Sequence, residues 1–72
     1  MKVFTLVWED GVVAGVYKDR RRAEVLLFGD YINMLKNSAG YNGKMVAQDL
    51  AQYFEEGCIP GIGRIYETEV IE

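Results

Sequence analysis

Residues 3–17 contain two runs in which nearly every position is apolar, and the runs meet at Asp10-Gly11. Short runs of β-branched and aromatic residues on either side of Asp-Gly are typical of a β-hairpin, because this dipeptide accepts the positive φ angles of a tight turn. If Asp10 and Gly11 alone form the loop, Trp8 pairs with Val13. The pattern therefore predicts a hairpin with a two-residue primed turn.

Both faces of this predicted hairpin are apolar, since successive side chains of a strand point to opposite sides. One face carries Phe4, Leu6, Trp8, Val13 and Tyr17, which we expect the helices to cover. The other carries Val3, Thr5, Val7, Val12, Ala14 and Val16. We expect this second face to remain uncovered and to bind another subunit or a target protein.

Two helices are predicted to follow the hairpin. Asp19 is placed to cap a helix over residues 20–39, which ends at Gly40, and Asn42 is placed to cap a second helix over residues 43–56. Apolar residues fill an arc of about 200° on the first helix, which is more than one sheet face covers. The first helix is therefore expected to contact both the sheet and the second helix.

Residues 57–63 form an irregular apolar segment with a turn at Pro60-Gly61. Ile59 and Ile62 lie on either side of this turn, so the loop either packs on the core or offers a contact surface. Residues 64–71 alternate again and predict a third strand, which we place beside the first.

These elements predict one domain over residues 1–72 with an α+β fold of two layers and the element order ββααβ. The sheet is expected to be three-stranded and mainly antiparallel, in the order 2-1-3, with two helices packed on one face. A chain of this length buries only about 60% of its unfolded surface. One cysteine and no histidine leave neither a disulfide nor a zinc site for support, so we expect a homodimer.

The charges are unevenly distributed along the chain. A net charge of −3 and a pI near 4.8 argue against general affinity for nucleic acids. A basic cluster nevertheless surrounds the start of the first helix, and it consists of Lys18, Arg20, Arg21 and Arg22. These residues either contact an anion, a nucleic acid or an acidic protein, or they bond to the acidic last strand or lie solvated.

Residues for catalysis are scarce. Cys58 is the only thiol, and no histidine is present to activate it. The glycines of residues 57–63 match no phosphate-binding fingerprint, because they connect a helix to a strand. We therefore expect no catalytic, cofactor or metal site and no enzymatic activity. The sequence holds no membrane span or signal peptide, which favours a cytoplasmic protein.

The hairpin, the segment 15–19 that leads into a charged helix start, and the glutamate-rich residues 65–71 together resemble small phage and bacterial α+β proteins of unknown function. The resemblance implies an accessory protein that binds and blocks a host protein. We therefore predict a small non-enzymatic protein-binding module, with nucleic-acid or anion binding as the alternative. The candidate interface residues are Val3, Val7, Val12, Ala14, Val16, Tyr41, Ile59 and Ile62.

Overall fold

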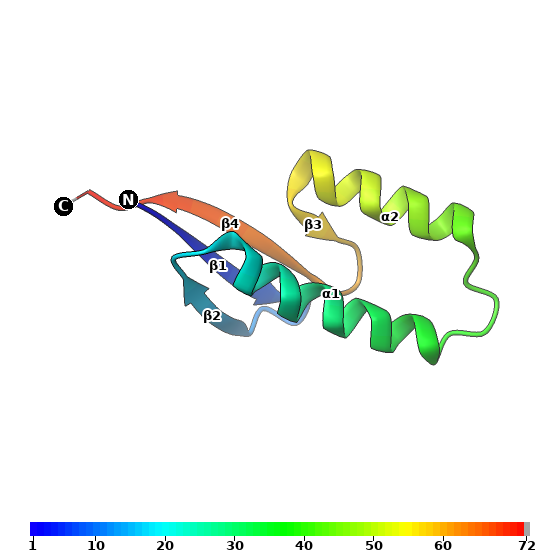
Figure 1. Ribbon diagram of the computed structural model, residues 1–72. Coiled ribbons are helices and arrows are strands. Elements are labelled where there is room, and N and C mark those ends of the chain that lie inside the picture. Colours follow the sequence, from blue (N-terminus) through cyan, green and yellow to red (C-terminus); the bar gives the residue numbers. More distant parts are fainter. Residues whose placement is uncertain (72) are drawn as a thin grey trace.

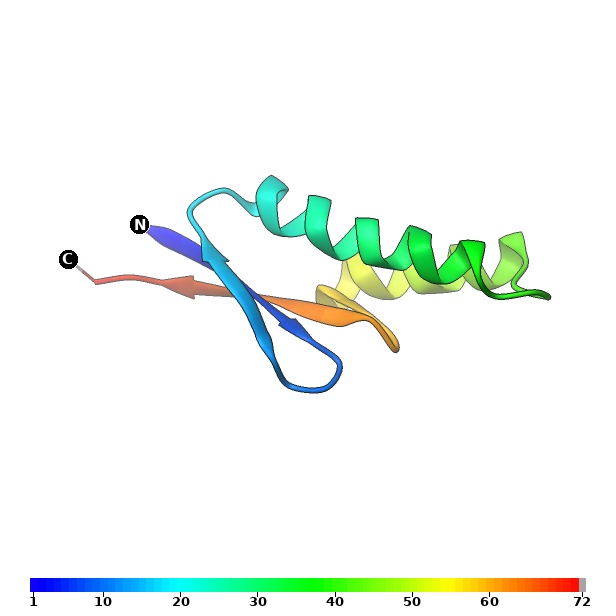
Figure 2. The ribbon, with the colours of Figure 1, turned by 90° about the horizontal axis from the view of Figure 1, so that it is seen from below.

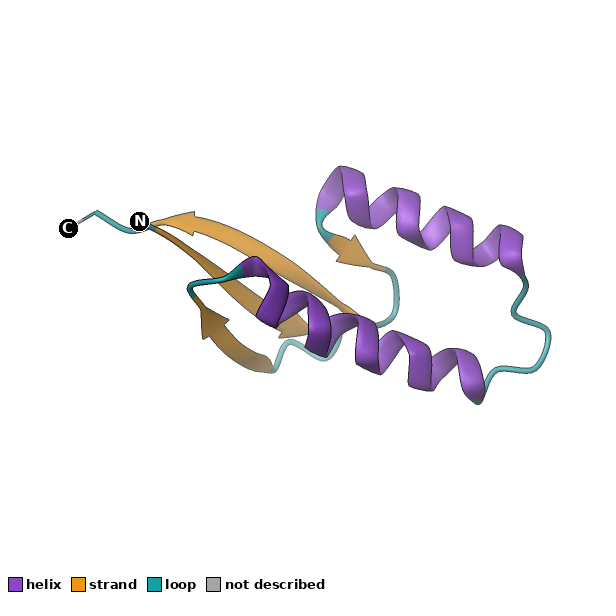
Figure 3. Ribbon diagram, viewed as in Figure 1, coloured by secondary structure: helices purple, strands orange, loops and turns teal. Residues whose placement is uncertain are grey.

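The computed structural model describes residues 1–71 and shows an α+β fold of two helices and one antiparallel sheet (Figures 1 and 3). The four strands lie in the order β2-β1-β4-β3. In chain order the elements are β1 (Lys2–Trp8), β2 (Val13–Tyr17), α1 (Arg20–Lys36), α2 (Gly43–Glu56), β3 (Cys58–Ile59) and β4 (Gly63–Glu69).

The α+β class predicted from the sequence is confirmed, but the sheet has four strands where three were predicted. The added strand, β3, comes from the segment expected to be a loop, and it pairs Ile59 with Gly63. The chain reverses at Pro60-Gly61, where Gly61 takes a left-handed φ of 79°. This tight reversal brings β3 back alongside β4, so the predicted order 2-1-3 is replaced by β2-β1-β4-β3. The last strand does lie beside β1.

The hairpin loop between β1 and β2 is longer than predicted. The Gly11 amide donates to the Trp8 carbonyl at 2.8 Å, and the Trp8 amide donates to the Val12 carbonyl at 2.9 Å. The loop therefore holds residues 9–11, and Gly11 closes it at a φ of 89°. A left-handed glycine in the third position is typical of three-residue hairpin loops.

The extra loop residue changes which side chains share a face. Val13 pairs with Val7 instead of Trp8. A bulge between Leu6 and Val7 compensates for the extra loop residue, so the partners of residues 4–6 are those predicted. Val13 thereby moves to the face opposite Leu6, whereas Ala14 packs against the core. The predicted faces of these two residues were wrong, because the pattern did not reveal the bulge.

The helix caps follow the sequence more closely. The Asp19 carboxylate accepts a hydrogen bond from the Arg21 amide, and the Asn42 side chain accepts one from the Met45 amide. The first helix, however, ends at Lys36 and not at residue 39. The Asn37 side-chain amide donates to the Asn33 carbonyl at 2.9 Å, so the chain leaves the helix three residues before Gly40.

Helix α1 covers one face of the sheet and contacts β1, β2 and β4, while α2 packs against β3 (Figure 2). The helices extend beyond the sheet, and the molecule measures 48 × 21 × 18 Å. None of the described helices is long and apolar enough to cross a membrane. The buried core consists of Leu6, Ala23, Leu27, Tyr31, Tyr53, Ile59, Ile62 and Ile65.

Aromatic side chains hold the two helices together. The rings of Phe28 and Tyr53 meet edge to face with centroids 5.0 Å apart. The Tyr53 hydroxyl donates to Glu24 at 2.7 Å, and the Tyr31 hydroxyl donates to Asp49 at 2.8 Å. Burial, followed by the bond to Asp49, raises the pKa of Tyr31 to about 12. Each helix therefore supplies one tyrosine and one carboxylate to the contact.

Candidate functional site

The face of the sheet opposite α1, which we call the open face, is the main candidate site. Residues directly opposite each other in antiparallel strands point to the same side, so the pairing defines its members. The open face consists of Val3, Thr5 and Val7 of β1, Val13 and Val16 of β2, and Arg64, Tyr66 and Thr68 of β4.

Large apolar side chains on the open face are exposed to water. The exposed fractions are 55% for Val13, 60% for Val16 and 50% for Tyr66. The Arg64 guanidinium lies 5.8 Å from the centroid of the Tyr66 ring, which places one cation at the margin of the patch. A flat apolar surface with an aromatic ring and an arginine at its edge has the composition of a protein interface.

The accessible surface of the whole molecule supports the same view. It measures 5014 Å², whereas a compact monomer of this mass exposes about 4,500 Å². The excess reflects the elongated shape and the sheet face that no helix covers. The molecule therefore exposes more surface than a compact monomer of the same mass.

The predicted interface residues of the hairpin lie in three places. Val3, Val7 and Val16 belong to the open face. Val12 is 57% exposed and lies opposite Trp8, at the loop end of the hairpin. Ala14 packs against the core, as described above, and is not available for an interface.

The candidates outside the hairpin are not free contact residues. Ile59 is fully buried and Ile62 is 8% exposed, because the short strand β3 folds this segment onto the core. The Tyr41 side chain is half-buried, and its hydroxyl donates to the Asp49 carboxylate. The expectation that these three residues form a contact surface is corrected: they stabilise the helix pair and the end of the sheet.

The basic cluster at the start of α1 also divides. The Arg20 guanidinium lies 3.9 Å from the Glu67 carboxylate. It also lies over the rings of Phe4 and Tyr53, at 5.8 Å and 5.7 Å from their centroids. Arg20 therefore links α1 to the last strand and to α2, as the alternative interpretation of the cluster expected.

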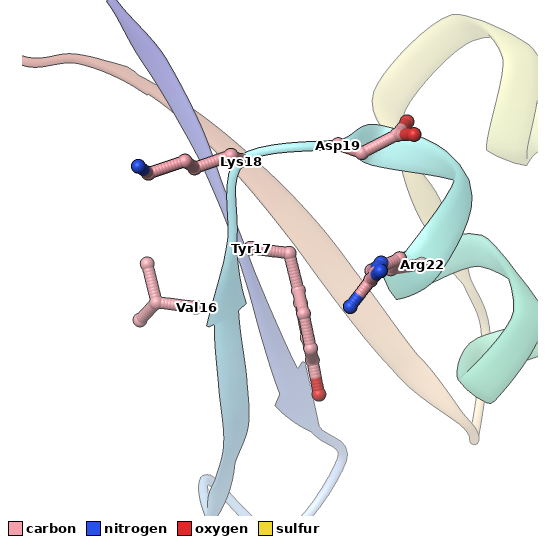
Figure 4. A pocket seen from close by; sticks show the side chains of 5 residues that line it. All are labelled: Val16, Tyr17, Lys18, Asp19 and Arg22. Carbon is pink, nitrogen blue, oxygen red and sulfur yellow. The ribbon is translucent and has the colours of Figure 1, made fainter.

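Lys18 and Arg22 have different surroundings. They line a surface recess of about 420 Å³ together with Val16, Tyr17 and Asp19 (Figure 4). Within residues 1–71, none of the ion pairs involves Lys18, Arg21 or Arg22. Arg21 is also exposed, but it lies outside this recess and lines another one with Glu24, Val25 and Phe28.

Sequence reasoning missed the contacts between the helices and four members of the open face, namely Val13, Arg64, Tyr66 and Thr68. The register of the last strand with β1 was needed to place Tyr66 beside Thr5. The tyrosine bonds to Glu24 and Asp49 have no signal in the hydrophobic pattern, because their partners lie 29 and 18 positions apart in the chain.

Cys58 is half-buried and lies opposite Arg64 at the end of the sheet. Comparison of the chain with protein-family models, curated proteins and solved structures finds no match.

Proposed function

We propose that this protein is a cytoplasmic, non-enzymatic protein-binding module that forms a homodimer through the open face. The observation that carries the proposal is the exposure of Val13, Val16 and Tyr66 on a sheet face without a covering layer. Two-layer folds bury an apolar sheet face against another element, and residues 1–71 provide no element for this face. A second copy supplies an identical apolar surface.

The size of the open face sets the expected strength of the dimer. With strands about 4.8 Å apart and a rise of about 3.3 Å per residue, β1, β2 and β4 form a face roughly 14 Å wide and 23 Å long. This is smaller than a standard interface, which buries about 800 Å² on each partner. We therefore expect a dimer that dissociates on dilution.

The test is the mass in solution, measured by size-exclusion chromatography with light scattering over a range of concentrations. The expected mass at high concentration is twice the 8.2 kDa of the chain. Val16→Asp is expected to give a folded monomer, because an aspartate on each copy places like charges within an apolar interface.

Val25→Asp provides the matched control. Val25 is 71% exposed but lies on α1, away from the open face, so this variant is expected to remain a dimer. A wild-type monomer at all concentrations overturns the homodimer. If both variants are monomeric, the homodimer through the open face is also overturned, because the effect of Val16→Asp is then not specific to that face.

The resemblance to phage proteins extends the proposal to a target, a host protein that the module binds and blocks. A pull-down from the native host, repeated with Val16→Asp, tests whether the open face also contributes to that interaction.

Binding of a nucleic acid or another anion is the second candidate, favoured by the unpaired cations around the recess at Lys18 and Arg22. It predicts salt-sensitive binding of DNA or RNA that weakens when these residues are replaced. A mobility-shift assay at low salt without any shift would eliminate this candidate.

A further inference from the structure

The outer edge of β2 is a second place at which this molecule can bind a protein. Among the described strands, β2 pairs only with β1, so its other edge is free over Val13–Tyr17. A free edge presents backbone N–H and C=O groups that accept an added strand. The segment contains no proline, so no donor is missing from this edge.

Cationic side chains lie on both sides of this edge. Val16 and Lys18 point to one side of β2, whereas Tyr17 and Arg22 lie on the other side, toward α1 (Figure 4). Successive residues of an added strand also point to alternate faces. Two adjacent acidic residues in such a strand would therefore meet Lys18 on one face and Arg22 on the other.

The acidic residues of β4 are already engaged elsewhere. Glu67 lies 3.6 Å from the Lys2 amine and 3.9 Å from the Arg20 guanidinium, and Glu69 lies 3.2 Å from the terminal amine. Lys18 and Arg22 have no ion-pair partner in the part of the chain that the structure describes. The end of β2 thus carries Lys18 and Arg22 beside the single carboxylate of Asp19, in a chain whose net charge is −3.

We propose that the β2 edge binds an extended acidic segment of a partner protein, which adds to the sheet as a fifth strand. Its backbone bonds to β2, its adjacent carboxylates contact Lys18 and Arg22, and an apolar side chain packs beside Val16. This inference rests on the proposed protein-binding function and names the chemistry of the partner. The edge adjoins the open face and shares Val16 with it, but the added strand bonds to the backbone of β2.

The test is an NMR titration of the ¹⁵N-labelled protein with a synthetic peptide of eight residues. The peptide is built from valine and threonine and contains two adjacent glutamates. The largest shifts are expected at residues 13–18 and Arg22, with contacts between the peptide backbone and β2. A peptide N-methylated at every residue has no backbone N–H to donate on either side, and it is expected to bind at least tenfold more weakly.

Charge variants test the contribution of the cations. Lys18→Glu combined with Arg22→Glu is expected to weaken binding of the peptide about tenfold or more. Lys36→Glu combined with Lys44→Glu makes the same change in net charge at the ends of α1 and α2, and it is expected to leave binding within about twofold.

Four results would overturn the proposal. They are no shifts at millimolar peptide, equal binding of the N-methylated peptide, equal weakening by both charge pairs, and shifts caused by a single-stranded oligonucleotide but not by the peptide. Light scattering keeps this proposal separate from the homodimer. A monomer that binds the peptide at β2 removes only the homodimer, and a dimer that does not bind it removes only this inference.

Discussion

The two faces of the sheet are built from similar residues, yet their surroundings are opposite. On the covered face, Leu6 is fully buried and Ile65 is 5% exposed beneath α1. On the open face, Val13 and Val16 are more than half exposed. The difference shows that an alternating apolar strand predicts which side chains need burial, but the fold must supply the layer that buries them.

The placement of the helices explains why only one face is covered. Helix α1 follows the hairpin after Asp19 and lies across the three long strands on one side. Helix α2 lies beside α1 on aromatic contacts, among them that of Phe28 with Tyr53, and reaches the sheet only at β3. No element remains to cover the other face within the described chain.

Leu6→Ala and Val16→Ala give the largest contrast between the faces. Removal of a fully buried leucine side chain costs about 2–5 kcal/mol, because it leaves a cavity under α1. The entire free energy of unfolding of a domain of this size is roughly 4–11 kcal/mol. We expect Leu6→Ala to lose about 2–5 kcal/mol of this free energy, and Val16→Ala to lose less than about 0.5 kcal/mol as a monomer.

Urea unfolding followed by circular dichroism, at a concentration where the protein is monomeric, measures both changes. A loss of more than about 1.5 kcal/mol for monomeric Val16→Ala would contradict the assignment of the open face, since a solvated valine contributes little to folding.

Gly63→Ala and Gly15→Ala refine the comparison within the covered face. A Cβ at Gly63 would lie 2.8 Å from the Val7 carbonyl oxygen, a backbone atom that cannot rotate away. At Gly15 the nearest atom is the terminal hydroxyl of Tyr17, which moves when the side chain turns about its Cα–Cβ bond. We expect a loss of about 1–3 kcal/mol for Gly63→Ala and less than about 1 kcal/mol for Gly15→Ala, measured by thermal unfolding.

Equal losses in the two glycine variants would mean that the Tyr17 ring is as rigid as the backbone at Gly63. The edge strand β2 would then be packed as firmly as the centre of the sheet.

Hydrophobic periodicity and cap residues predicted much of this fold, because they act locally. The N-caps Asp19 and Asn42, the span of α2 and the strand near residues 64–71 follow from neighbours within a few positions. The short strand β3 and the bulge that exchanges Val13 with Ala14 depend on the hydrogen-bonded pairing between strands, which the period of a single strand does not show. A two-residue strand has too few residues to produce a period.

The candidate site shows the same limit. The alternation of the hairpin identified Val3, Val7 and Val16, because their side is fixed by their spacing from Thr5. The sequence left open whether Ile59 and Ile62 lie in the core or at the surface, because an apolar loop next to glycines has no periodic pattern that assigns its side chains to a face. Only the pairing of β3 with β4 decides their burial.

Tyr31→Phe tests the contact that holds α2 beside α1, the helix that covers the sheet. The substitution removes the hydroxyl that donates to Asp49 at 2.8 Å and leaves the ring in place. We expect a loss of about 1–2 kcal/mol at pH 7, because the bond is to a carboxylate and partly buried. The open face and the mass in solution are expected to be unchanged, which light scattering measures.

The same variant is expected to change the alkaline stability. Tyr31 loses its proton near pH 10 in the unfolded chain but only near pH 12 in the folded protein, because its pKa is raised. Between these values the unfolded state holds fewer protons, so a rise in pH favours unfolding. The free energy of unfolding is therefore expected to decrease more steeply from pH 9 to 12 for the wild type than for Tyr31→Phe. Equal slopes for the two proteins would contradict the raised pKa.

Glu67→Gln gives the smallest expected effect and tests where the covered face ends. Glu67 lies opposite Phe4, on the side that α1 covers, but its side chain is 47% exposed at the margin of the helix. Its ion pairs with Lys2 and Arg20 measure 3.6 Å and 3.9 Å. Pairs of this kind contribute less than about 1 kcal/mol and are screened by salt.

We therefore expect Glu67→Gln to lose less than about 1 kcal/mol at low salt, and the difference from the wild type to vanish near 0.5 M salt. Glu55→Gln is the control, because Glu55 is exposed on α2 and takes part in no ion pair of the described residues. A loss that persists at high salt would show that Glu67 is anchored beneath α1. The part of the sheet that α1 covers would then extend to the N-terminal end of β1.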